Sequence, residues 1–75
     1  MVSIQKIIEI IGSAGVVPDM TKFDPDKTFK ENGIDSLDVF TLFLAVEETL
    51  GVDFSEEDSV SIKSAREIVE HLNSR

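Results

Sequence analysis

The residues from 32 to 38 join a turn to a long apolar helix, and their serine is well placed for covalent chemistry. Gly33 can adopt the positive φ that ends a short turn, and Asp35 or Ser36 can cap the free N–H groups of the following helix. Those N–H groups and the helix dipole favour negative charge. A phosphate ester on Ser36 would therefore be stabilised where it forms.

The polar residues at this corner have two compatible roles. Taken alone, Asp35 and Ser36 are helix caps, and Asp38 in the first turn complements the helix dipole. A cap needs only one side chain, so the other can point to solvent. We therefore interpret Asp35 as the cap that presents Ser36, and Ser36 as the residue open to modification.

Length and composition restrict the remaining possibilities. The 75 residues predict a single domain, 1–75, and the absence of Cys excludes disulfides, thiolate metal sites and thiol chemistry by the polypeptide. The net charge of −8 argues against nucleic acid as a partner and favours basic protein surfaces. Neither a membrane-spanning run nor a secretion signal is found, so we expect a cytoplasmic protein. We also expect it to be a monomer.

A first helix and a long connection are expected before the serine. Isoleucines at 4, 7, 8 and 11 have the spacing of one helix face, with Ser3 as N-cap and Gly12 or Gly15 as the end. Residues 16–33 predict a long loop, in which Thr28 and Glu31 have the spacing of a capping box. Four apolar residues are expected to hold this loop by packing inward: Val17, Phe23, Phe29 and Ile34. Asp24 and Asp26 are interpreted as solvated turn residues, because the rest of a calcium loop is missing.

The second helix is predicted from Leu37 to Leu50. Its apolar arc is wide enough to indicate a central helix with the others packed around it, and comprises Val39, Leu42, Phe43, Val46 and Leu50, extended by Leu37, Phe40 and Leu44. At the edge of this arc, Leu37 and Leu44 are flanked by Thr41, Glu47 and Glu48. Such an edge suits docking to a basic surface with a hydrophobic depression, although core rim explains the spacing equally well.

Two further helices complete the predicted fold. Ser55 caps a short helix with acids in its first turn, after which Val60 and Ile62 can be buried. Ser64 and Glu67 form a capping box for the last helix, whose apolar face is Ala65, Ile68, Val69 and Leu72. His71 has no partner residues for a metal site and is expected to be half-exposed. The fold class is therefore all-α, with four helices, a long first loop and a short third helix.

The motif from Gly33 to Asp38, followed by a helix ending in Glu47 and Glu48, resembles the modification site of acyl carrier proteins. The resemblance covers essentially the whole chain. It implies a four-helix bundle in which Ser36 carries a 4′-phosphopantetheine arm from coenzyme A, attached by a phosphopantetheinyl transferase. The thiol of the arm would hold acyl cargo as a thioester for enzymes of fatty-acid, polyketide or related specialised lipid biosynthesis.

The resemblance also implies that the helix after Ser36 faces the partner enzymes. The implied docking residues are Leu37, Asp38, Thr41, Leu44, Glu47 and Glu48. Candidates for sheltering an acyl chain are Phe40, Phe43, Leu44, Val46 and Ile62. Where many fatty-acid carriers have an acidic residue in the middle of this face, this chain has Thr41, so its partners and acyl pocket can differ.

Other functions are less well supported by the residues. An aminoacyl or peptidyl carrier shares the modified serine, but the acidity of this chain argues mildly against it. An unmodified acidic module for protein contacts is the second alternative. We expect no enzymatic activity, because no base is placed to activate Ser36 and no G-x-S-x-G motif is present.

Overall fold

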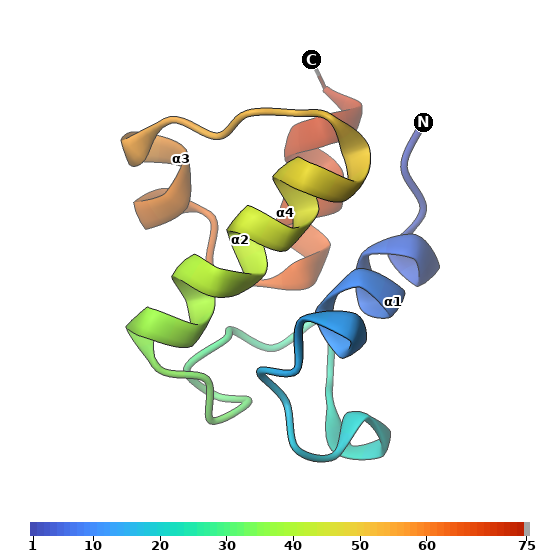
Figure 1. Ribbon diagram of the computed structural model, residues 1–75, viewed down its shortest axis with the longest axis vertical. Helices are drawn as coiled ribbons and strands as arrows, with labels where there is room; N and C mark the ends of the chain where they lie inside the picture. Colours follow the sequence, from blue (N-terminus) through green and yellow to red (C-terminus); the bar gives the residue numbers. More distant parts are fainter. Residues whose placement is uncertain (75) are drawn as a thin grey trace.

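The computed structural model describes residues 1–74, and these form four α-helices with one short 3₁₀ helix (Figure 1). The α-helices are α1 (Ile4–Ala14), α2 (Ser36–Leu50), α3 (Glu56–Ser61) and α4 (Ala65–Asn73). The 3₁₀ helix η1 (Met20–Lys22) interrupts the first loop and was not predicted. No strand occurs in residues 1–74, so the all-α prediction with a long first loop and a short third helix is confirmed.

Each α-helix begins at a side chain that caps its free N–H groups. The N-caps are Ser3, Asp35, Ser55 and Ser64, as the sequence predicted. Ser55 and Asp58 form a reciprocal capping box, in which each side chain accepts a hydrogen bond from the backbone of the other. At the other end of α2, Gly51 adopts φ 67°, a left-handed conformation that favours glycine.

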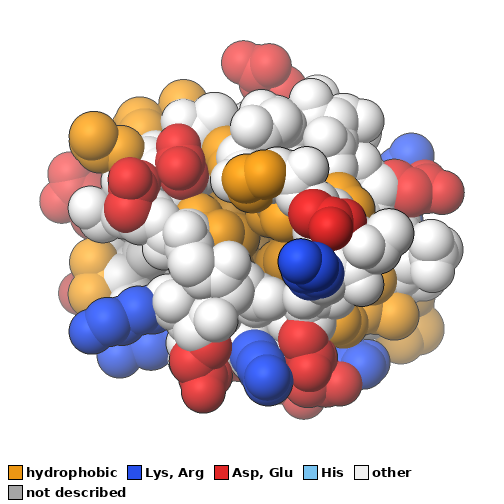
Figure 2. Space-filling model, turned by 90° about the horizontal axis from the view of Figure 1, so that it is seen from below, with side chains coloured by type: hydrophobic (Ala, Val, Ile, Leu, Met, Phe, Trp, Pro, Cys, Tyr) orange, Lys and Arg blue, Asp and Glu red, His pale blue; other side chains and the backbone are white. Residues whose placement is uncertain are grey.

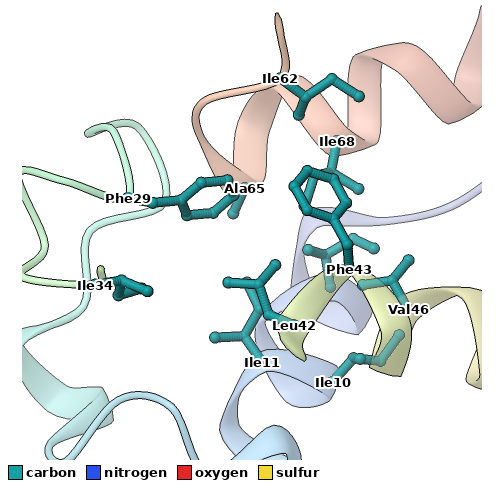
Figure 3. Packing of buried hydrophobic residues seen from close by; sticks show 11 residues of the cluster. Ile10, Ile11, Phe29, Ile34, Leu42, Phe43, Val46, Ile62, Ala65 and Ile68 are labelled. Carbon is teal, nitrogen blue, oxygen red and sulfur yellow. The ribbon is translucent and has the colours of Figure 1, made fainter. Parts of the chain in front are cut away.

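The core is built from apolar side chains of α1, α2, α4 and the loops between them (Figure 3). Helix α1 packs against both α2 and α4. The prediction that α2 is the central helix is therefore wrong, since α1 is the element that the other two long helices share. The wide apolar arc of α2 has another explanation, because Leu37, Phe40 and Leu44 are exposed and only Leu42, Phe43 and Val46 are buried.

The buried face of α1 is rotated slightly from the one predicted. Ile7, Ile10 and Ile11 are buried, whereas Ile4 and Ile8 are only partly covered. Gly15, at φ 74°, ends the helix. The helix therefore turns the side of Ile10 toward its neighbours. Because isoleucines occur on several sides of this helix, the sequence alone could not show which of them is buried.

The long first loop is held to the start of α4 by backbone and side-chain bonds. Phe29 N–H donates to Lys63 O at 2.7 Å, and Arg66 N–H donates to Pro25 O at 3.0 Å. The guanidinium of Arg66 also contacts the Asp26 carboxylate at 2.8 Å, which raises the pKa of Arg66. The loop is therefore ordered by its attachment to α4, and Asp26 forms an ion pair with Arg66.

Apolar residues add to this attachment, although not all equally. Phe29 and Ile34 are buried, as predicted, and Val17 and Phe23 are half-buried. The capping-box bonds of Thr28 and Glu31 are present, at 2.9 and 3.0 Å, but the segment forms a turn and not a helix.

Helix α3 and the link after it correct one prediction. Ile62 is buried, but the Val60 side chain is 74% exposed. Helix α3 is short, so it turns only some of its residues toward the core, and Val60 is not one of them. His71 is partly exposed and lies 3.4 Å from the Asp58 carboxylate and 5.8 Å, between ring centroids, from Phe54.

The two ends of the chain lie close together. The Asn73 side chain accepts a bond from Val2 N–H at 2.8 Å and donates one to Val2 O at 2.9 Å. Figure 1 shows both termini at the opposite end of the molecule from the start of α2. Among residues 1–74, no helix is long and apolar enough to cross a membrane.

Candidate functional site

Ser36 is the first residue of α2 and is exposed. Asp35 is the N-cap, and its carboxylate oxygen Oδ1 accepts a hydrogen bond from Asp38 N–H at 2.9 Å. The Ser36 hydroxyl has no hydrogen-bond partner in the described part of the chain. The cap and the presented hydroxyl are thus separate side chains, as the sequence predicted.

The backbone that leads to Ser36 is fixed by a tight turn. Gly33 has φ 79°, a conformation that side chains other than glycine's rarely adopt. Its N–H donates to Lys30 O, and the next N–H, of Ile34, donates to Phe29 O at 2.9 Å. The side chain of Ile34 is buried and anchors this turn, whereas Ser36, two residues later, lies at the surface.

A largely apolar groove begins beside Ser36 and runs between α2 and α3. Its volume is about 950 Å³. Figure 2 views the molecule from below, the side on which the first loop lies in Figure 1, and hydrophobic side chains are visible there between polar and charged ones. The lining comes from the first loop, the start of α2, α3 and the following link, and its apolar members are Phe29, Ile34, Val39, Phe40, Phe43, Val60 and Ile62.

The groove contains some of the residues expected to shelter an acyl chain and excludes others. Phe40, Phe43 and Ile62 line it. Val46 does not, because it is fully buried in the core. Leu44 lines a separate, smaller hollow. Val46 and Leu44 therefore have other surroundings than the sequence analysis expected.

The predicted docking residues lie along α2, with different degrees of exposure. Leu37 and Leu44 are 78% and 42% exposed, and Thr41 and Glu48 are also exposed. Asp38 and Glu47 are half-buried.

Two of these polar side chains already have partners within the fold. The Thr41 hydroxyl donates to Leu37 O at 3.2 Å, and the Glu47 carboxylate accepts from Phe54 N–H at 2.7 Å. The docking role of all six residues stays a prediction.

Sequence reasoning missed two features of the site. Phe40 is 61% exposed and Val60 74% exposed, so each presents a large apolar surface beside the groove. Lys30 and Lys63 also line the groove. The sequence analysis placed Phe40 in the extension of the α2 arc but did not predict its exposure, and the exposure of Val60 depends on how the short α3 is oriented.

A family model described as phosphopantetheine attachment site matches residues 5–72. The chain belongs to the acyl carrier protein family. It is 34% identical over 73 residues to an acyl carrier protein of Solidesulfovibrio magneticus, covering 95% of this chain and 91% of the relative. A Campylobacter hominis acyl carrier protein is 34% identical over 67 residues, covering 85% and 84%.

A further acyl carrier protein is mitochondrial. This relative, from Dictyostelium discoideum, is 42% identical over 48 residues, which are 64% of this chain and 40% of the relative. Acyl carrier proteins therefore occur among both bacterial and mitochondrial relatives of this chain.

Membership of the acyl carrier protein family implies a 4′-phosphopantetheine prosthetic group. The residues present fit that group. The Ser36 hydroxyl is exposed at the N-terminus of a 15-residue helix, where backbone N–H groups favour a phosphate. The adjoining groove is mostly apolar, which suits an acyl chain better than a polar ligand. Family membership also implies interaction with biosynthetic enzymes and acyl cargo.

Among residues 1–74 there is no group of three or more side chains of the kinds that hold a metal ion.

Proposed function

We propose that Ser36 carries the 4′-phosphopantetheine arm and that this chain delivers acyl thioesters to enzymes of fatty-acid, polyketide or related specialised lipid biosynthesis. The observation that carries the proposal is the exposed Ser36 hydroxyl, beside a capped helix N-terminus and a groove of about 950 Å³. The arm, when attached, supplies the thiol that a chain without Cys lacks.

The residues around Ser36 have separate tasks in this function. Asp35 caps α2, which leaves the Ser36 hydroxyl accessible to a transferase. The remaining free N–H groups of the first turn stabilise the phosphate charge once it is attached. The chain itself acts as a carrier and not as a catalyst, because the transferase supplies the chemistry of attachment. Tethering the cargo raises its effective concentration at each partner active site.

Partner enzymes are proposed to dock on the exposed side of α2. Leu37 and Leu44 supply apolar contacts, while Asp38, Thr41, Glu47 and Glu48 supply polar and acidic ones. The net charge of −8 suits partners with basic docking surfaces, since charge complementarity accelerates association. We place this function in the cytoplasm, with the 75 residues acting as one monomeric domain.

The test is the intact mass after incubation with coenzyme A, Mg²⁺ and a broad-specificity phosphopantetheinyl transferase. We expect one phosphopantetheinyl addition to the wild type and none to Ser36→Ala. Ser55→Ala is the matched control, because Ser55 is also an exposed serine at the start of a helix, and it should accept the group normally.

No addition to the wild type, with a second carrier modified in the same reaction, would favour an unmodified module for protein contacts. An aminoacyl or peptidyl carrier would also accept the arm. It would be distinguished by loading from an adenylation enzyme in place of an acyl-transferring one.

A further inference from the structure

Two adjoining hollows lie along the side of α2 that faces α3. The larger hollow is the groove of about 950 Å³ described above, which has Ser36 in its lining. The smaller, of about 100 Å³, lies farther along α2 and is lined by Leu44, Glu47, Phe54, Ser55 and Glu56. Three residues line both hollows, namely Phe40, Phe43 and Ser59. These three side chains therefore form the boundary between the hollows.

Two of the boundary residues are held in place. Phe43 is 3% exposed and makes edge-to-face contacts with Phe29 and Phe54, at centroid distances of 6.1 and 5.0 Å. Ser59 is small, and its hydroxyl donates to Glu56 O at 2.9 Å. Neither can move aside without breaking contacts of the fold.

Phe40 is the boundary residue that can be truncated with the least effect on the fold. Its side chain is 61% exposed, and none of the aromatic ring contacts among residues 1–74 involves it. Replacing it should therefore cost little stability, while its phenyl ring lies at the boundary between the two hollows.

The smaller hollow is suited to the end of an apolar chain. Leu44 and Phe54 contribute apolar surface, and Phe43 forms the shared wall. Of its two acidic members, Glu56 is exposed to solvent, and Glu47 already accepts a hydrogen bond from Phe54 N–H at 2.7 Å. That carboxylate keeps its partner when water leaves the hollow, so burial of a hydrocarbon there leaves Glu47 paired.

We propose that Phe40 sets the length of the acyl chain that this carrier shelters. The inference rests on the proposed function, in which the acyl chain carried through Ser36 occupies the larger hollow. With Phe40 in place, the chain ends at the phenyl ring. Removing the ring joins the two hollows. The smaller hollow, of about 100 Å³, then adds room for about three methylene groups, if each takes up the volume of one water molecule, about 30 Å³.

The experiment loads a series of saturated acyl groups of increasing length onto the arm of wild type, Phe40→Ala and Ile8→Ala. Ile8 is the matched control, because it is a partly exposed apolar residue of α1 that lines neither hollow and lies outside the proposed docking surface. The readout is the rate of thioester cleavage by hydroxylamine, which requires the thioester to be exposed. Circular dichroism confirms that each variant is folded.

In the wild type, the rate should fall with chain length and then level off where the chain meets Phe40. In Phe40→Ala the decrease should continue for about three more carbons, by about fourfold per added methylene group. Ile8→Ala should level off at the same chain length as the wild type. If the rate levelled off at the same chain length in wild type and Phe40→Ala, the proposal would be overturned, even if transfer to a partner enzyme slowed.

A second variant identifies the space that the longer chain enters. In the double variant Phe40→Ala with Leu44→Phe, the phenyl ring at position 44 fills the smaller hollow. The chain length at which the rate levels off should then return toward that of the wild type. If that chain length stayed as long as in Phe40→Ala, the acyl chain would enter some other space, which also contradicts the proposal. Failure of the proposed function is seen separately, because the wild type would then show no phosphopantetheinyl addition by mass.

Discussion

The Asn32 side chain binds both backbone polar groups of Asp24, eight residues earlier in the chain. Asn32 Oδ1 accepts from Asp24 N–H and Asn32 Nδ2 donates to Asp24 O, each at 2.9 Å. The same amide nitrogen donates to Thr28 O at 3.0 Å. One side chain thus closes the last part of the first loop immediately before Gly33 and the turn that leads to Ser36.

Replacing Asn32 with Ala should therefore destabilise the fold. The change leaves the partly buried N–H and carbonyl of Asp24 without their partner, at a cost of about 1–3 kcal/mol in the free energy of unfolding. The measurement is urea denaturation followed by circular dichroism. Asn32→Asp keeps the acceptor of Asp24 N–H but places a carboxylate oxygen against the carbonyl oxygens of Asp24 and Thr28, so its loss of stability should be at least as large as that of Asn32→Ala. Equal stability of Asn32→Ala and wild type would show that the loop is held by its other contacts alone.

Glu31 should titrate below its ordinary pKa of 4.5. The backbone N–H of Thr28 is the main cause of this lowered pKa, followed by the Thr28 side chain and the charge of Lys27. Since folding lowers this pKa, the associated stability is present above pH 4.5 and is lost as the pH falls through the folded-state pKa. Carbon-13 NMR of the side-chain carboxyl group measures the pKa directly. Thr28→Ala should move the Glu31 midpoint upward, and a midpoint that did not move would contradict the contribution of the threonine side chain.

Glu47 and the adjacent Glu48 should differ in their effect on stability. Glu47→Ala removes the acceptor of Phe54 N–H, a charge-assisted bond, so we expect a loss of about 1–2 kcal/mol. Glu48→Ala is the matched control, because Glu48 is exposed and its replacement should change stability by less than about 0.5 kcal/mol. Thermal and urea unfolding of both variants test the difference. If the two changes have the same effect, the bond between Glu47 and Phe54 adds nothing measurable to stability.

Added salt should raise the melting temperature. A net charge of −8 on 75 residues makes the folded chain repel itself, and counterions reduce that repulsion. Differential scanning calorimetry at increasing NaCl, and with a millimolar divalent cation, measures the effect. The exposed-site variant Glu48→Gln lowers the negative charge by one and should show a weaker response to salt. An unchanged or lower melting temperature in the wild type would be the contrary result.

The helix starts were predictable because each depends on a local side chain. Ser3, Asp35, Ser55 and Ser64 all cap the helices that their positions in the sequence indicated. A cap acts over three residues, so its position can be predicted from the local sequence without knowing how the rest of the chain packs. The presentation of Ser36 was predictable for the same reason.

Features that depend on packing between distant segments were not predictable. The burial of Ile10 in place of Ile8 depends on which side of α1 meets α2 and α4. The exposure of Phe40 and Val60 reflects a groove between α2 and α3 that a helical wheel cannot show. The bond from Phe54 to Glu47 joins residues on either side of a turn, and nothing local in the sequence indicates it.

The link between Asn73 and Val2 has a practical consequence for attaching this protein to a solid support. Because the two ends of the chain meet, an anchor on either one holds the molecule by the same end. Helix α2 starts toward the other end of a body 30 Å long (Figure 1). An array of molecules anchored in this way would place Ser36 on the side away from the support.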